Sequence, residues 1–130
     1  MTNILNSDLK EKFKKIGKKF NLNLFVLFGS RAKGNFNENS DWDFAYFSTK
    51  NIDEEKLELE LFKLLKGKAF DLINISNPTN PELEFRIFNE GVVLYEKNKN
   101  LFLEFKLQSY FSIKDGEILL NKTRDKFLAA

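Results

Sequence analysis

A Gly-Ser pair at the end of one apolar run, followed by two aspartates at the head of another, constrains this chain more than any other feature. Gly29 and Ser30 follow the apolar segment 24–28, and Asp41 and Asp43 lead into a second apolar segment. A glycine-broken turn can bring backbone N–H groups close to a phosphate. Paired carboxylates can hold a hard divalent cation. Together they predict nucleotide chemistry.

Composition limits the chemistry that is open to such a site. The 130 residues are enough for one domain with a real core, and we expect a single domain over 1–130. The chain has no cysteine and no histidine, which excludes thiolate zinc sites, cysteine nucleophiles and the usual general base. A net charge of +2 does not favour direct binding of nucleic acid. With no signal core and no membrane-length apolar stretch, we expect a cytoplasmic protein without a membrane contact.

Apolar periodicity and turn residues predict an alternating α/β order with a small mixed sheet flanked by helices. Ser7 and Asp53 are predicted to cap helices, and Asn80-Pro81 to start one. The predicted helices cover 8–20, a short segment from Ser30, 53–67, 80–91, 98–113 and 118–127; the predicted strands cover 21–28, 41–48, 69–75 and 92–95. The predicted core spans about 8–96, with C-terminal helices over about 98–128.

Three aspartates are the candidate catalytic and metal-ligating residues. Asp41 and Asp43 are two positions apart on a predicted strand, so they project from the same face with Cα atoms roughly 7 Å apart. Asp71 interrupts an apolar strand, where a charge is costly to bury unless it is paired or bound to a metal. If that strand lies beside the strand of Asp43, all three can share two Mg²⁺ ions about 3.5–4 Å apart.

The Gly-Ser turn supplies the candidate nucleotide contacts. Gly29 allows a close approach of backbone to phosphate, and the Ser30 hydroxyl can add a contact or cap the following helix. Arg31 and Lys33 follow within one turn and could neutralise phosphate charge, Arg31 less so if it points to solvent. A nucleoside triphosphate with two Mg²⁺ ions is the expected ligand.

The spacing of these residues resembles the polymerase-β-like nucleotidyltransferases. Gly29-Ser30, ten intervening residues and then Asp41-x-Asp43, with Asp71 on a later strand, match the motif of that family. The short length and the segment 87–95 are similar to its minimal nucleotidyltransferase (MNT) group. The resemblance covers about residues 9–110 and implies the polymerase-β-like fold. Trp42 and Phe44 depart from the aliphatic residues common there, and neither is in the ligand set.

Small proteins of this group are similar to the antitoxins of two-gene HEPN–MNT toxin–antitoxin modules. The resemblance implies a protein adenylyltransferase that transfers AMP from ATP to a tyrosine of a HEPN-type RNase, the partner expected in a hetero-oligomer. One alternative is a small-molecule nucleotidyltransferase of the aminoglycoside-modifying kind, for which an acidic acceptor cleft would be evidence. Another is a non-catalytic antitoxin that acts by binding alone.

Other conspicuous residues receive an ordinary structural interpretation. Trp42 lies between two aspartates of one face, so its ring should point to the opposite face and pack in the core. Arg86, within the helix that follows Pro81, could reach a phosphate or a partner, but such an arginine is more often a surface residue, and we assign it no role. The early lysines are interpreted as the solvated face of a helix.

Overall fold

The computed structural model describes residues 5–77 and 80–115 of the chain. In chain order its elements are α1 (Ser7–Lys19), β1 (Leu24–Phe28), α2 (Ser30–Lys33), β2 (Trp42–Phe47), α3 (Glu54–Leu64), β3 (Phe70–Asn74), α4 (Pro81–Glu90), β4 (Val92–Glu96) and α5 (Leu101–Asp115). The alternating order predicted from the sequence is confirmed within these ranges. The helix predicted over 118–127 lies outside the described residues.

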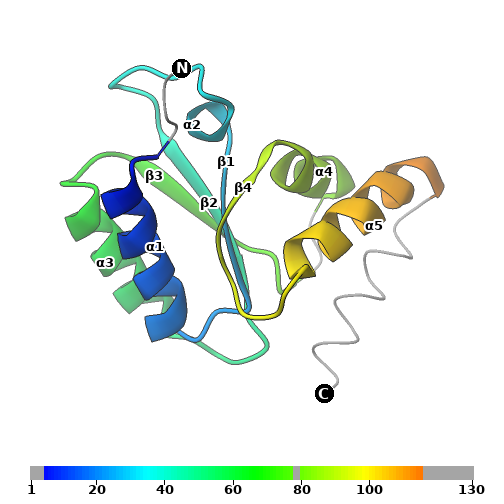
Figure 1. Ribbon diagram of the computed structural model, residues 1–130, viewed down its shortest axis with the longest axis horizontal. Coiled ribbons are helices and arrows are strands. Elements are labelled where there is room, and N and C mark those ends of the chain that lie inside the picture. Colours follow the sequence, from blue (N-terminus) through cyan, green and yellow to red (C-terminus); the bar gives the residue numbers. More distant parts are fainter. Residues whose placement is uncertain (1–4, 78–79, 116–130) are drawn as a thin grey trace.

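The four strands form one mixed sheet in the order β3-β2-β1-β4. β1 runs antiparallel to both β2 and β4, whereas β2 and β3 run parallel. The parallel pair is joined through α3, because parallel neighbours need a crossover connection. The start of β2 and the start of β3 therefore lie at the same end of the sheet, where β1 ends and α2 begins (Figure 1).

Helices cover both faces of the sheet. α1 and α3 lie on one face, and α4 and α5 lie on the other (Figure 1). Alternate residues of a strand point to opposite faces, so β1, β2 and β3 contribute to both cores, whereas the core residues of β4 belong to the one under α1 and α3. Toward α1 and α3, the Phe44 ring lies 5.4 Å from the rings of Phe13 and Phe25. Toward α4 and α5, Phe105 lies 5.4 Å from Phe47 and 5.2 Å from Phe88. The abundant phenylalanines thus fill two separate cores.

Local hydrogen bonds set the ends of the elements. Asp53 and Asn80 cap α3 and α4 as predicted, through bonds from the N–H groups of Lys56 and Glu82. The predicted cap at Ser7 is wrong by one residue, because the Asn6 side chain accepts the N–H of Leu9 at 2.8 Å.

Two further predictions at element ends need correction. β1 begins three residues later than predicted, because the N–H groups of Asn21 and Leu22 bond back to the carbonyls of Lys18 and Gly17. Ser30 does not cap α2: Gly29 occupies the N-cap position, where no side-chain bond is made, and Ser30 is the first helical residue.

α4 approaches β1 closely where it ends. A Cβ on Gly91 would overlap the Ile87 carbonyl oxygen and lie 2.6 Å from Cγ1 of Val26. Glycine therefore permits the close approach that seats α4 against the sheet.

None of the helices in the described part of the chain combines the length and the apolar character that crossing a bilayer would require.

Candidate active site

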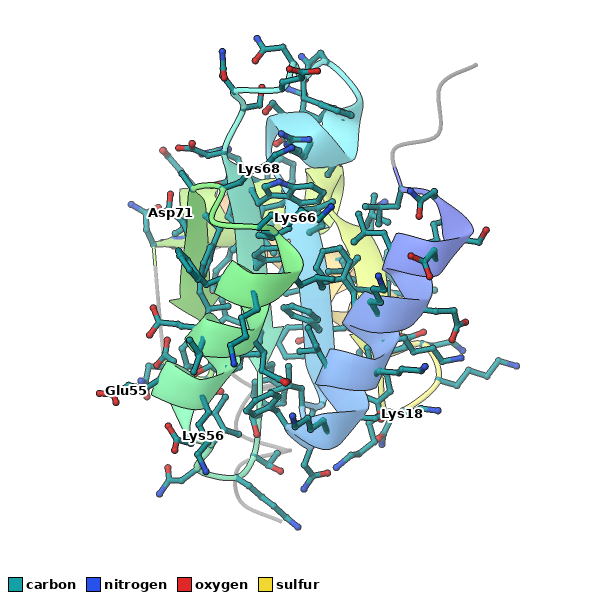
Figure 2. All side chains as sticks on the ribbon, turned by 90° about the vertical axis from the view of Figure 1, so that its left-hand side faces the viewer. Lys18, Glu55, Lys56, Lys66, Lys68 and Asp71 are labelled. Atoms are coloured by element: carbon teal, nitrogen blue, oxygen red, sulfur yellow. The ribbon has the colours of Figure 1, made fainter. Side chains whose placement is uncertain are left out.

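The two parallel strands place Asp43 and Asp71 side by side. Asp43 on β2 and Asp71 on β3 are direct partners in the register of the sheet. Partners on neighbouring strands point to the same face and lie about 5 Å apart. Asp41 lies just before β2, which begins one residue later than predicted, and it is close enough for its charge to act on Asp43. Figure 2 shows Asp71 at the end of the sheet that carries α2, far from Glu55 at the opposite end. The predicted adjacency of β2 and β3 is therefore confirmed.

Gly29 closes this group from the side of β1. Phe28, the last residue of β1, is the register partner of Asp43, so the following turn passes directly beside the carboxylate. Gly29 has φ +78°, and a Cβ there would overlap Oδ2 of Asp43 and lie 3.2 Å from its Cγ. Glycine is thus required twice, for its backbone conformation and for the space that the carboxylate occupies. Ser30 follows at the partly exposed start of α2.

The electrostatics of Asp43 reflect these neighbours. Burial raises the pKa of the Asp43 carboxyl above its ordinary value, and the negative charges of Asp71 and Asp41 raise it further. The positive charge of Arg86 opposes this and lowers the pKa. Three carboxylates that repel one another in this way form a region where a bound cation would be stabilised.

The donor chemistry of the three aspartates fits magnesium, which prefers carboxylate oxygens. Within residues 5–77 and 80–115, however, no three His, Cys, Asp or Glu side chains are gathered tightly enough to hold a metal ion together. Asp41 and Asp71 are exposed and Asp43 is half-buried. The predicted three-carboxylate metal site therefore stays a prediction, for which the register of Asp43 and Asp71 is the supporting geometry.

Arg31, predicted as a phosphate contact, has its side chain engaged by the protein itself. Its side chain is buried, with only 6% of it exposed, and does not point to solvent. Nε and Nη2 donate to the carbonyl oxygen of Ser40 at 3.1 and 3.0 Å, and Nη2 also donates to that of Glu38. The guanidinium lies between the rings of Phe36 and Trp42, at 4.7 and 4.5 Å from their centroids. Arg31 thus fixes the loop that leads directly into Asp41.

Trp42 behaves as its position predicts. Its indole is buried on the face away from the aspartates, in contact with Phe13 and Phe44 as well as with Arg31. Core packing of this residue is confirmed.

Lys33 lies near the site and pairs with Glu90. The same glutamate pairs with Arg86, a residue to which the sequence analysis assigns no role. Lys33 Nζ lies 3.8 Å from Glu90 Oε2, and Arg86 Nε lies 3.9 Å from Glu90 Oε1. The Arg86 guanidinium also lies 6.0 Å from the centroid of the Phe28 ring, next to Gly29. The sequence signal that could have pointed to Arg86 is its place as a basic residue on the exposed face of the helix after Asn80-Pro81. Its proximity to Asp43 depends on how α4 packs on β1, which a single sequence does not reveal.

Hollows elsewhere on the described surface differ in character from this site. One of about 360 Å³ lies beyond the other ends of β2 and β3. Its hydroxyl groups already bond to the protein: Ser76 Oγ accepts the N–H of Ser48 and donates to its carbonyl oxygen. Another, of about 290 Å³, lies along the first turns of α4 and is bounded by Asn80, Glu82, Leu83 and Arg86.

Comparison with known proteins gives a family match over most of the chain. The family model described as "Polymerase beta, Nucleotidyltransferase" matches residues 11–100. A curated protein, the protein adenylyltransferase MntA of Aphanizomenon flos-aquae (strain 2012/KM1/D3), is 35% identical over a match that covers 65% of this chain. The match spans 64% of the length of that relative.

Solved structures share the fold at lower identity. One is described as a toxin–antitoxin with AMP-PNP; it is 20% identical, has a TM-score of 0.68, and the match covers 90% of this chain and 96% of the other. A second is described as a tri-AMPylated Shewanella oneidensis HEPN toxin in complex with an MNT antitoxin, at 18% identity and a TM-score of 0.55, covering 96% of this chain and 88% of the other. At these identities the likeness establishes the fold alone.

Proposed function

Because the chain belongs to the polymerase beta nucleotidyltransferase family, we propose that it is a protein adenylyltransferase that silences a HEPN-type RNase toxin. In this proposal it transfers AMP from ATP to a tyrosine of that toxin and so serves as the antitoxin. Support comes from the adenylyltransferase relative and from the toxin–antitoxin complexes that share the fold. The observation that carries the proposal is the register of β2 and β3, which sets Asp43 beside Asp71 next to Gly29.

Asp41, Asp43 and Asp71 would hold the Mg²⁺ ions of the reaction. Bound there, the cations would lower the pKa of the attacking hydroxyl and stabilise the charge of the leaving pyrophosphate. Carboxylates that already repel one another suit this role, because a cation offsets their repulsion.

The remaining steps use residues of the chain. The tyrosine oxygen attacks the α-phosphorus of ATP, a new O–P bond forms, and the bond to the β-phosphate oxygen breaks to release pyrophosphate. Asp71 is exposed at the start of β3 and is our candidate acceptor for the hydroxyl proton. The Ser30 hydroxyl and the Lys33 ammonium are the candidate phosphate contacts beside Gly29.

The hollow of about 290 Å³ that Arg86 borders gives no support to an aminoglycoside acceptor. Its lining includes one glutamate and one arginine, so it lacks the acidic character that a polycationic drug would require.

Labelled transfer tests the proposal directly. The full chain, α-labelled ATP, magnesium and the folded HEPN protein encoded by the neighbouring gene should give a labelled HEPN protein. Absence of label, with the partner folded and active as an RNase, would contradict the proposal. Joint replacement Asp41→Ala with Asp43→Ala separates transfer from binding: if the double variant still silences the toxin, the chain acts by binding alone.

A further inference from the structure

One glutamate of α4 engages two cations that come from different elements. Glu90 is the anion of both pairs, with Lys33 Nζ at 3.8 Å from one carboxylate oxygen and Arg86 Nε at 3.9 Å from the other. The Glu90 side chain is 24% exposed, whereas those of Lys33 and Arg86 are 49% and 56% exposed. The carboxylate is thus held near the protein surface, while the two cations extend into solvent around it.

These two cations both lie near the Gly-Ser turn. Lys33 is in the single turn of α2 that begins right after Gly29. Arg86 reaches the turn from α4, with its guanidinium 6.0 Å from the centroid of Phe28, the residue before Gly29. α4 packs on the same face of the sheet as Asp43, and the charge of Arg86 lowers the pKa of Asp43. The two cations therefore border the candidate phosphate position beside the three aspartates.

The ion pairs with Glu90 are poor candidates for a purely structural role. Exposed pairs at 3.8–3.9 Å are screened by water and contribute little to stability. A single carboxylate also leaves one of the two positive charges unneutralised. A triphosphate carries several negative charges and several acceptor oxygens, so it can replace the carboxylate as the partner of both cations. Arg86 also borders the hollow of about 290 Å³, which gives its side chain room to turn.

We propose that Arg86 and Lys33 form a polyphosphate clamp for the nucleotide and its pyrophosphate leaving group, and that Glu90 occupies both cations until the nucleotide displaces it. This inference rests on the proposed function, since its ligand is the triphosphate tail of a nucleotide. Glu90 then acts as an intramolecular competitor that lowers the affinity for polyphosphate. Arg86 is a phosphate-binding residue in this account, and Glu90 is a positioning residue.

Calorimetric titration with inorganic triphosphate and magnesium, in the absence of any acceptor protein, tests the clamp without depending on transfer. Arg86→Gln should weaken binding by about 10-fold, as expected for the loss of a charge-assisted contact. Glu90→Gln should tighten binding about 3-fold or more, because the competing anion is gone. Glu55→Gln removes the same charge at the opposite end of the molecule and should leave the affinity unchanged (Figure 2).

A triple variant, compared with the variant that lacks only the two cations, decides how Glu90 acts. If Glu90 competes for the clamp, the gain from Glu90→Gln should shrink when Arg86→Gln and Lys33→Gln are also present. An undiminished gain, or Glu90→Gln indistinguishable from Glu55→Gln, would overturn the clamp. Thermal melting checks that each variant is folded, which we expect because the substituted side chains are partly or half exposed. Failure of AMP transfer with intact triphosphate binding would contradict the proposed function and leave the clamp standing.

Discussion

Asp43 of β2 and Asp71 of β3 are register partners in a parallel strand pair, and Gly29 at the end of β1 lies against the first of them. Three elements far apart in sequence thus meet at one end of the sheet. This relationship explains why burial and two neighbouring carboxylates raise the pKa of Asp43. It also gives each of the three positions a separate, testable consequence.

Asp43→Asn should abolish transfer and leave the fold intact. The amide keeps the shape of the carboxylate and loses the charge, so we expect transfer to fall by about 100-fold or more. Ser30→Ala should be milder, since backbone N–H groups remain as phosphate donors. Single-turnover transfer to the HEPN partner measures both variants. Loss of activity in Ser30→Ala together with retained activity in Asp43→Asn would reverse our assignment of roles.

Asp43→Asn should also change the stability of the fold, by an amount that depends on pH. The folded chain holds the proton of Asp43 more tightly than the unfolded chain does, because the folded-state pKa is raised. The stability from this group is therefore present below the ordinary aspartate pKa and lost as the pH rises through the raised pKa. In metal-free buffer at about pH 7, Asp43→Asn should melt at the same temperature as the wild type or higher. Near pH 3 the difference should vanish, and a variant that melts much lower at neutral pH would contradict this account.

The magnesium concentration should set the position of the acid limb in the profile of transfer rate against pH. A protonated Asp43 cannot ligate a cation, so transfer should fall as the pH drops through the raised pKa. Higher magnesium concentration competes with the proton and should move this limb to lower pH. Initial rates measured across pH at two magnesium concentrations give the comparison. An acid limb that does not respond to magnesium would indicate a titrating group outside the metal site.

Gly29→Ala should disable the site because the added methyl group displaces the side chain of Asp43. The added Cβ would overlap Oδ2 of Asp43, so the carboxylate must turn away from the group. Gly67→Ala is the matched control: φ at Gly67 is +79°, against +78° at Gly29, but the nearest atom to its added Cβ is 3.7 Å away. Both variants should lose about 1–2 kcal/mol of unfolding free energy to backbone strain, with a further loss at Gly29 from the overlap. Only Gly29→Ala should lose transfer, and equal loss in both would implicate backbone strain alone.

Arg31→Lys should weaken magnesium-dependent binding of the nucleotide, although in this account the Arg31 side chain contacts neither the nucleotide nor the metal ion. An ammonium cannot reproduce the paired donation to the Ser40 carbonyl or the packing between Phe36 and Trp42. Asp41 follows Ser40 directly, so its position should become less defined. Loss of such supporting contacts commonly costs about 10–100-fold in affinity. Calorimetry with ATP gives the affinity, and faster amide exchange in the loop 34–40 would show that the loop has loosened. Unchanged binding with a loosened loop would separate Arg31 from the site.

Much of the fold follows from local patterns in the sequence. The apolar stripe of α3 and the caps at Asp53 and Asn80 predict those helices because the signals lie within a few residues of one another. The order of the strands is a different kind of fact. Whether β3 pairs with β2 depends on packing across the whole chain, and the sequence predicts that Asp71 lies near Asp43 only if the two strands pair.

The basic residues show the same limit within the site. Arg31 follows the Gly-Ser pair and resembles a phosphate contact, but its guanidinium packs against two aromatic rings and donates to two carbonyl oxygens of the next loop. Arg86 resembles a surface arginine, yet the packing of α4 on β1 brings its guanidinium near Phe28, where its charge lowers the pKa of Asp43. The spacing of the sequence points to the candidate aspartates and to the Gly-Ser turn, whereas tertiary contacts determine which basic side chains lie near them.

Calorimetry of magnesium-dependent ATP binding most directly asks whether aspartates of two parallel strands act as one ligand set. The comparison is between the wild type, Asp71→Asn and Asp8→Asn, which removes an exposed carboxylate on α1. Wild type and Asp8→Asn should bind ATP in a magnesium-dependent manner with the same affinity, and Asp71→Asn should lose that dependence. Magnesium-dependent binding in Asp71→Asn equal to that of the wild type would contradict the shared site.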